Sequence, residues 1–340
     1  MRKVVICSGG TGGHMFPACA LFQAMQKKKY NVTVLTDTRG SIFCDDISKK
    51  VIIKTIRLTD GWKTISSFLS VFPKIIKFFL EKRPDIIIGF GGIFTIMPLI
   101  IAKILGVKVA VYEQNSVAGK ANKFIAKFAD VKLSSFDLGK GWKEVRSPVR
   151  KEFLQSQPYK CEGKIRILVI GGSQGAASFY KIIPKALKFL SESERQNLEI
   201  VQQVSYGNLE ELSLTYNKLQ VKADLRRFLH NIAEIMNNSE LIICRSGAST
   251  LSELAATGRP AILIPYPKSA DNHQLSNALY YENKKAAWVL EENGEISENL
   301  GKIIREVLLD RKLLKNAAFH MKNLATSQTV ENFIELIETV

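Results

Sequence analysis

Short runs of β-branched and aliphatic residues recur along the first half of the chain, separated by longer stretches whose apolar residues have helical spacing. The runs lie at 3–8, 31–36, 51–56, 85–90 and 107–112. The second half repeats the pattern, with runs at 165–170, 198–204, 240–244 and 261–264. Buried strands that alternate with helices are typical of βαβ units and parallel sheets. The pattern therefore predicts an α/β protein with two doubly wound parallel-sheet domains.

The pattern is interrupted between residues 149 and 163, where Pro148, Pro158 and a polar stretch precede the second set of strands. We therefore expect an N-terminal domain at 1–155 and a C-terminal domain at 156–328. The last residues, 329–340, are apolar at helical spacing, and by analogy we expect this helix to pack back on the N-terminal domain. Ligands of doubly wound sheets bind at the carboxyl ends of the strands. A cleft between the two domains is the expected site.

The composition of the chain limits which binding partners and which cellular compartment we expect. The chain has 48 Lys and Arg against 32 Asp and Glu, a net charge of +16, which suits nucleic acid, a phosphorylated substrate or an acidic membrane surface. Its five cysteines form no CxxC pair, which argues against a disulfide framework and a structural zinc site and favours a reducing cytoplasm. The N-terminus lacks the pattern of a signal peptide, and the longest uncharged run, 86–102, is shorter than a membrane span.

Two strands run directly into glycine-rich turns, Gly9-Gly10-Thr11-Gly12-Gly13-His14 and Gly171-Gly172-Ser173-Gln174-Gly175-Ala176. Glycine lets the backbone approach an anion closely, and the helix that follows directs its positive end toward the same point. Neither turn has the spacing of the dinucleotide fingerprint or of a P-loop, which disfavours an NAD enzyme and ATP hydrolysis. No D-x-D pair occurs, so Mg²⁺ has no obvious ligands, and we expect no metal or other cofactor. The alternative is that both turns merely join strand to helix.

Other strand ends carry candidate chemistry. His14 would lie in the first turn of a helix, where an imidazole can act as general base; the alternative is a capping or core histidine. The stretch from Cys244 to Glu253 again offers backbone N–H groups to a phosphate, and Glu253 is placed to accept ribose hydroxyls or to cap the helix. A third glycine cluster, 89–92, and the triplet at 113–115 follow further strands.

Bulky apolar residues recur at helical spacing between Ile65 and Arg83, with lysines nearby. They include Phe68, Phe72, Ile75 and Phe79. This pattern fits a helix that lies at a membrane interface. It fits a helix that covers a sheet equally well, so both interpretations stay open at this point.

Five motifs in order resemble the MurG family of bacterial peptidoglycan N-acetylglucosaminyltransferases. They are GGTGGH at 9–14, Glu113-Gln114-Asn115, Ser147-Pro148-Val149-Arg150, GGSQGA at 171–176 and the stretch 245–253. The resemblance covers essentially the whole chain. It implies a GT-B glycosyltransferase that transfers N-acetylglucosamine from UDP-GlcNAc to the muramyl 4-hydroxyl of lipid I, with inversion and without metal chemistry, to give lipid II.

The resemblance also implies residue roles. Donor contacts would come from Thr11, Gly12, Gly13, Asn115, Arg150, Ser173, Leu229, Ala248, Ser249, Thr250, Glu253 and Gln274. The acceptor diphosphate would lie near Gly12, Gly13, Gly91 and Gly92. His14 would be the base, with Glu113 as its alternative. The N-terminal domain would dock peripherally on the anionic cytoplasmic face of the cell membrane, through Phe68, Phe72, Ile75 and Phe79, and cell-wall synthesis and division proteins become candidate partners.

Some positions depart from the family pattern, and other functions stay open. Tyr112 stands where the family usually has histidine, and Ser147 where it has asparagine. Another GT-B transferase, for example one that glycosylates diacylglycerol, would share much of the donor half. A non-catalytic UDP-sugar-binding scaffold is a further alternative. A nucleic-acid binder ranks last, because the lysines are scattered and no nucleic-acid module is recognisable; we expect no nucleic-acid partner.

Overall fold

The computed structural model describes residues 2–44, 47, 49–53, 61–172, 176–325 and 330–339, except the side chains of 53 and 61–70. The chain divides into two compact units. Unit 1 comprises Met1–Arg150 with Ser327–Val340, and unit 2 comprises Lys151–Thr326. The division after Arg150 lies five residues before the boundary expected at 155, and the C-terminal segment belongs to unit 1.

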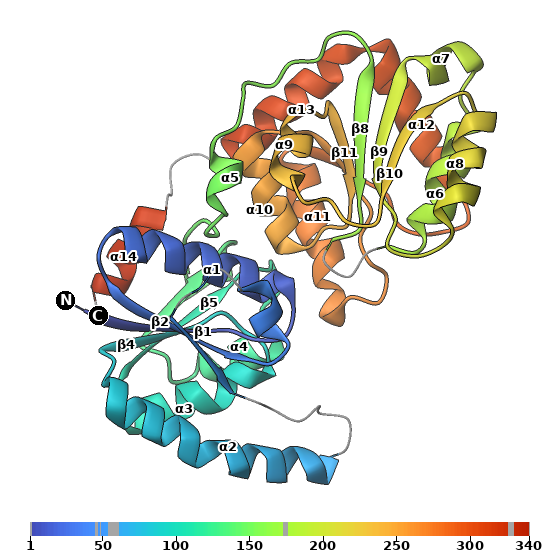
Figure 1. Ribbon diagram of the computed structural model, residues 1–340. Helices are drawn as coiled ribbons and strands as arrows, with labels where there is room; N and C mark the ends of the chain where they lie inside the picture. Colours follow the sequence, from blue (N-terminus) through green and yellow to red (C-terminus); the bar gives the residue numbers. More distant parts are fainter. Residues whose placement is uncertain are drawn as a thin grey trace. The chain divides into compact units, whose positions relative to one another are not determined.

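Unit 1 is built on a parallel sheet (Figure 1) with strand order β3-β2-β1-β4-β5-β6-β7. Its strands are β1 (Lys3–Cys7), β2 (Asn31–Asp37), β3 (Lys50–Ile53), β4 (Ile86–Gly89), β5 (Lys108–Glu113), β6 (Val131–Ser134) and β7 (Lys143–Glu144). Its helices are α1 (Gly12–Lys27), η1 (Gly40–Phe43), α2 (Gly61–Lys82), η2 (Ile93–Thr95), α3 (Ile96–Ile104), α4 (Lys120–Ile125) and α14 (Val330–Glu338). Because β1, β4 and β5 are neighbours, the turns that follow them lie along one edge of the sheet.

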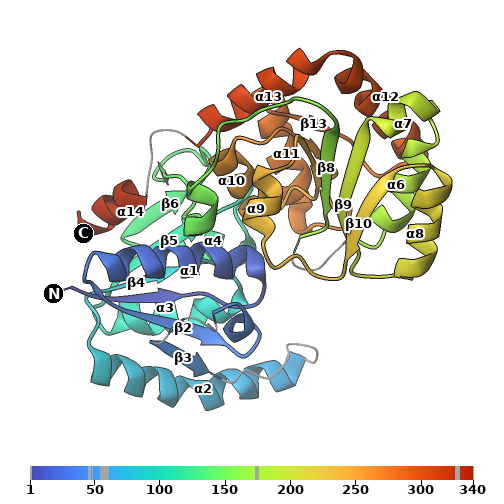
Figure 2. The same ribbon diagram turned by 45° about the horizontal axis from the view of Figure 1, so that its top comes forward.

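Alternate residues of each strand face opposite sides, so the sheet of unit 1 has two cores. Val4 and Ile6 of β1 pack with buried residues of α1 and α14. Val5 and Cys7 pack on the other side with residues of α2 and α3. Figure 2 shows α1 and α14 side by side, and the two helices are in contact. The C-terminal helix therefore completes the same core as the N-terminal strand and helix.

Unit 2 repeats this architecture with the parallel strand order β10-β9-β8-β11-β12-β13. Its strands are β8 (Ile165–Ile170), β9 (Leu198–Gln203), β10 (Lys222–Arg226), β11 (Leu241–Cys244), β12 (Ala261–Leu263) and β13 (Ala287–Val289). Its helices are α5 (Lys151–Leu154), α6 (Phe179–Leu187), α7 (Glu192–Gln196), α8 (Leu209–Lys218), α9 (Ile232–Asn237), α10 (Ala248–Thr257), η3 (Ala270–Asn272), α11 (His273–Asn283), α12 (Ile296–Leu309) and α13 (Arg311–Asn323).

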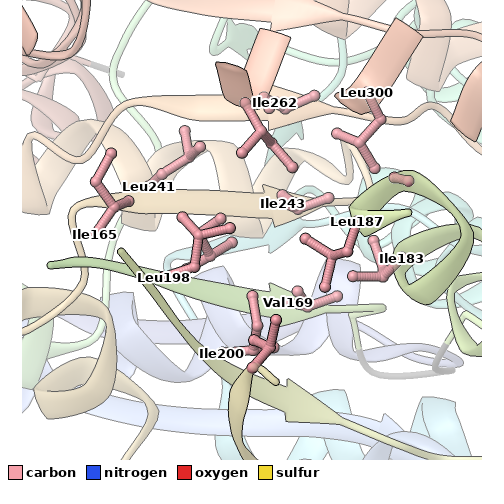
Figure 3. Packing of buried hydrophobic residues seen from close by; sticks show 14 of the residues in the cluster. Ile165, Val169, Ile183, Leu187, Leu198, Ile200, Leu241, Ile243, Ile262 and Leu300 are labelled. Carbon is pink, nitrogen blue, oxygen red and sulfur yellow. The ribbon is translucent and has the colours of Figure 1, made fainter. Parts of the chain in front are cut away.

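The core of unit 2 joins strands and helices that are far apart in sequence (Figure 3). Val169 of β8 and Ile243 of β11 pack with Leu187 of α6 and Leu300 of α12, and each of these side chains is fully buried. Complete burial of one such side chain is worth about 1.5–3 kcal/mol. The prediction of two doubly wound parallel-sheet domains is thus confirmed.

The apolar stretch at 65–83 forms most of α2, and the structure corrects part of its predicted role. Ile75 and Phe79 are only 1% and 3% exposed and belong to the core beneath the helix. They cannot contact a membrane while the unit is folded, so these two predicted membrane contacts are wrong. Phe72, in contrast, is 43% exposed. The side chain of Phe68 lies outside the described residues. Within the described part of the chain, no helix is both long and apolar enough to span a bilayer.

Candidate active site

The first glycine turn of unit 1 ends at an N-terminus of α1 that has no side-chain cap. Thr11 is the N-cap residue, with extended backbone angles and no side-chain hydrogen bond to the helix. Gly12, Gly13 and His14 form the first turn. Helices α7, α8 and α13 differ, because Ser191, Asn208 and Asp310 cap them with side-chain oxygens. The backbone N–H of His14 donates to the carbonyl oxygen of Thr11 at 3.1 Å. A helix start without a side-chain oxygen still directs its positive dipole toward the space in front of it, which favours an anionic ligand.

The glycine cluster after β4 packs directly against this turn. Gly91 and Gly92 have φ values of +94° and +87°, which residues with a side chain rarely adopt. A Cβ at position 91 would lie 3.0 Å from Cε1 of His14, and one at position 92 would lie 3.1 Å from the carbonyl oxygen of Gly9. Both glycines are therefore required for the close approach of the two turns.

Asp37, at the end of β2, holds the first glycine turn and was not anticipated from sequence. Its Oδ1 accepts hydrogen bonds from the backbone N–H groups of Gly10, at 3.1 Å, and Gly40, at 2.8 Å. Nη2 of Arg39 lies 3.1 Å from Oδ2. Asp37 is fully buried, and these donors offset the cost of burying its charge. The only sequence signal was its place at a strand end beside β1.

Glu113 accepts four hydrogen bonds within its own loop. The backbone N–H and side-chain Nδ2 of Asn115 donate to Oε1, at 2.9 and 3.0 Å. The backbone N–H of Gly119 and Nδ2 of Asn122 donate to Oε2, at 3.0 and 2.8 Å. The side chain is 1% exposed. A carboxylate bound in this way fixes the loop between β5 and α4, and both of its oxygens are already engaged.

His14 is held by the next residue of the same loop. Nε2 of Gln114 forms a hydrogen bond with Nδ1 of His14, and the two residues are 100 positions apart in sequence. The imidazole is half-buried, while Gln114 is 2% exposed. The structure therefore brings together His14, Gly91, Gly92 and Gln114, which come from the turns after three neighbouring strands. The roles of Gln114 and Asn122 were not predicted.

In unit 2, α10 also begins without a side-chain cap. Gly247 is its N-cap residue, and a Cβ there would meet nothing within 4 Å. The predicted residues Ala248, Ser249 and Thr250 form the first turn, and Glu253 follows with 8% exposure. The arrangement offers an anion the start of a ten-residue helix at the carboxyl end of β11.

Arg245 braces the loops around this helix start. Its Nη1 donates to the carbonyl oxygens of Ile264 and Pro265, each at 3.1 Å. Its Nη2 donates to Oγ of Ser178 and lies 2.6 Å from Oε1 of Glu292. Its guanidinium lies over the ring of Phe179. Arg245 is 7% exposed, and these contacts of both terminal nitrogens hold the surrounding loops in place.

The remaining predicted donor residues lie at separate places in the two units. Leu229 is buried, with 5% of its surface exposed. Oε1 of Gln274 accepts from the backbone N–H of Tyr266 at 2.9 Å. The guanidinium of Arg150 lies 4.6 Å from the ring centre of Phe16, within unit 1. Ser173 lies outside the described residues. Among the residues that the structure describes, no three His, Cys, Asp or Glu side chains are grouped to hold a metal ion.

Comparison with known proteins identifies the family. The N-terminal domain of glycosyltransferase family 28 matches residues 4–133, and the C-terminal domain of that family matches residues 166–336. A UDP-N-acetylglucosamine--N-acetylmuramyl-(pentapeptide) pyrophosphoryl-undecaprenol N-acetylglucosamine transferase of Zymomonas mobilis is 33% identical, over 100% of this chain and 92% of that protein. The protein of the same description from Rickettsia bellii is 35% identical over 95% of both chains. This chain belongs to the MurG family of glycosyltransferases.

A solved structure agrees with this assignment to the MurG family. The crystal structure of MurG from Acinetobacter baumannii matches with a TM-score of 0.82 and 25% identity, covering 100% of both chains. The GT-B fold expected from sequence is thus confirmed for the MurG-family chain described here. Membership of family 28 also makes the chain a glycosyltransferase, which agrees with the enzyme class predicted from its motifs.

Proposed function

We propose that this protein transfers N-acetylglucosamine from UDP-GlcNAc to the muramyl 4-hydroxyl of lipid I, releasing UDP and forming lipid II. The relatives from Zymomonas and Rickettsia, which match over nearly their full length, are described as transferases of this kind. In the chain itself, the proposal rests on one arrangement: an imidazole held at an uncapped helix start, against the glycine turn of a neighbouring strand.

The donor diphosphate binds at the start of α10 in this proposal. The backbone N–H groups of Ala248, Ser249 and Thr250 surround it, and the helix dipole stabilises the charge that develops as UDP departs. Glu253, one turn along, accepts hydrogen bonds from the ribose hydroxyls. Leu229 contributes backbone groups to the uracil. Ser173 and Gln274 are further donor contacts on unit 2 that the family motifs imply.

The chemical step needs a base, and the geometry favours His14 over Glu113. The oxygen of the 4-hydroxyl attacks the anomeric carbon, the bond from that carbon to the diphosphate oxygen breaks, and its electron pair leaves with UDP. The hydroxyl proton passes to His14. In-line attack inverts the anomeric centre and gives a β bond. Glu113 is a poorer base because four N–H donors already occupy its two oxygens.

Unit 1 carries the acceptor and the membrane contact in this proposal. The acceptor diphosphate lies at the start of α1, beside Gly12, Gly13, Gly91 and Gly92. The outer face of α2 docks on the anionic cytoplasmic face of the cell membrane. Phe72 and Leu80 are 43% and 60% exposed on this helix, and the lysines at 74, 77 and 82 are exposed beside them. Exposed apolar groups among lysines are what an anionic lipid surface attracts.

The test is UDP release from UDP-GlcNAc in the presence of EDTA, with and without a lipid I analogue. We expect turnover that depends on the acceptor and survives chelation, because backbone N–H groups and helix dipoles carry the diphosphate charge. His14→Ala should lower kcat by about 10²- to 10⁴-fold, the usual contribution of general-base catalysis.

The control is His320→Ala on α13, which should retain full turnover. Binding of UDP-GlcNAc without any turnover of the lipid I analogue would overturn the proposed acceptor. Full turnover by His14→Ala would remove His14 as the base.

A further inference from the structure

The side chain that holds His14 has one end of its amide unpaired. Gln114 is 2% exposed and its Nε2 faces Nδ1 of His14. Its Oε1 is buried and has no hydrogen-bond partner among the residues that the structure describes. A buried amide oxygen without a partner is unfavourable, so its retention calls for an explanation, and a catalytic role is one such explanation. The two ends of an amide fill nearly the same volume, so either end can face the imidazole.

The choice of end decides what His14 can do. When the NH₂ end faces Nδ1, that nitrogen must use its lone pair to accept the hydrogen bond, and the ring proton is on Nε2. Nε2 then cannot accept a proton. When the oxygen end faces the ring, Nδ1 carries the proton and donates a hydrogen bond to Oε1, and Nε2 is the unprotonated nitrogen. Only the second arrangement makes Nε2 of His14 a base.

We propose that Gln114 is a positioning residue that sets the tautomer of His14, and that its Oε1 accepts from the Nδ1–H of His14 during the reaction. This inference rests on the proposed function above. The proton of the acceptor hydroxyl moves to Nε2 while the oxygen forms its bond to the anomeric carbon. The imidazolium that results has two N–H groups, and Oε1 of Gln114 binds the one on Nδ1. The NH₂ end could not stay there, because two donors would then face each other.

Groups on the surrounding elements explain why an amide suits this position. Among the described residues, the charged groups on the neighbouring turns are Glu113, the last residue of β5, and Asp37 and Arg39, at and just after the end of β2. The Glu113 oxygens bind four N–H groups, and Asp37 binds Gly10 and Arg39. The positive end of α1 opposes a charged imidazole. A neutral acceptor orients the ring without retaining the proton that the base must release, whereas a carboxylate at 114 would favour the imidazolium.

The tautomer can be measured without any turnover. The chain has four histidines, so ¹⁵N-histidine labelling gives few signals, and a His14→Gln sample assigns those of His14. At pH 8, with UDP-GlcNAc bound, we expect Nδ1 of His14 to be protonated and Nε2 not. In Gln114→Met, which fills the space without an acceptor, the two nitrogens should move toward the mixed values of a free imidazole. The other histidines serve as internal references and should not move. A proton on Nε2 of His14 in the unaltered protein would overturn the inference.

The second measurement is the pH dependence of kcat/KM for UDP release with the lipid I analogue. Gln114→Glu should move the acidic limb to higher pH by about one unit, because a carboxylate stabilises the imidazolium. Gln114→Met should lower kcat at least about tenfold while KM for UDP-GlcNAc stays unchanged. Gln202→Glu is the matched control, since Gln202 is another buried glutamine and accepts from the hydroxyl of Tyr216 in unit 2; it should leave the limb in place.

The outcomes separate the inference from the proposed function. A purely structural role for Gln114 would lower activity or stability in both variants without moving the limb, and would overturn the inference. If Gln114→Met does not fold, the inference is tested by the shift of the acidic limb in the isosteric Gln114→Glu variant alone. If the unaltered protein shows the predicted tautomer but no turnover of the acceptor, the proposed function fails while the control of His14 by Gln114 stands.

Discussion

Two buried carboxylates hold the turns that follow β1 and β5 in unit 1. Asp37 fixes Gly10 and the start of η1 through backbone N–H groups. Glu113 fixes Asn115, Gly119 and Asn122. At the residue scale, the sequence predicted which side chains could act in binding or catalysis. It did not predict which side chains hold these residues in position. The N–H donors that engage Glu113 become visible only once the loop is folded, and they favour a positioning role for it.

Glu113→Gln tests this role. The amide would turn an NH₂ group toward N–H donors, so we expect a loss of about 1–3 kcal/mol in the free energy of unfolding. Catalysis should fall with it, because the loop also carries Gln114. Urea unfolding and UDP release measure the two effects. Glu335→Gln, at an exposed site on α14, should stay within about 0.5 kcal/mol. Unchanged stability together with lost activity would instead indicate that Glu113 is the base.

At the scale of elements, the short strands β6, β7, β10 and β13 escaped the sequence. Strand β10 was not predicted, because it is an edge strand with the sequence KADLR, in which charges interrupt the apolar residues. Its Lys222 pairs in register with Glu199 of β9, which pairs in turn with Arg166 of β8. The placement of α14 on unit 1 was expected by analogy, and the structure shows that this helix contributes Phe333 to the core of that unit. Edge strands and the packing of α14 both depend on partners distant in the chain.

The row of charges on unit 2 predicts a pH dependence. The hydrogen bond from Lys222, together with that from Arg166, lowers the pKa of Glu199 below its usual value. A carboxylate whose pKa is lower in the folded state stabilises the protein above its unfolded pKa of about 4.3. This contribution is lost as the pH falls through the folded pKa. Because Lys222 is largely exposed, Glu199→Gln should cost less than about 1 kcal/mol at pH 7.

Urea unfolding checks this predicted pH dependence. It is measured for Glu199→Gln and for the unaltered protein, at pH 7 and near pH 3. The difference between the two proteins should shrink at the lower pH. A difference that grows as the pH falls would contradict the assignment.

An aromatic cluster connects α14 to the turns that follow β4 and β5, where the proposed active site lies. The ring of Phe333 lies 6.0 Å from that of Phe90 and 5.1 Å from that of Tyr112, between ring centres. Phe90 directly precedes Gly91, and Tyr112 directly precedes Glu113. Phe333→Ala should therefore cost about 3–5 kcal/mol and lower UDP release. Thermal unfolding and kinetics measure this. Phe319→Ala, on α13 where the ring is 63% exposed, should change little, and equal losses in both variants would refute the argument.

At the scale of the whole molecule, the charge of +16 and the exposed face of α2 predict binding to anionic vesicles. Binding should weaken with salt, because lysines near an anionic surface contribute about 1 kcal/mol each and are screened. Phe72→Asp should weaken it by roughly three- to tenfold through lost apolar burial. Phe319→Asp in unit 2 is the control. Vesicle co-sedimentation measures the binding, and equal effects of the two variants would argue against docking through α2.

The sequence by itself determined the fold class, the two sheets, the glycine turns and the candidate base, because these follow from local hydrophobic period and from residue types at strand ends. The tertiary structure decided which face of α2 is buried. Because Ile75 and Phe79 lie on that buried face, they make no membrane contact. It also decided that Gln114 holds His14 across 100 positions of chain. Such pairings depend on how neighbouring strands bring distant residues together, and no local pattern encodes them.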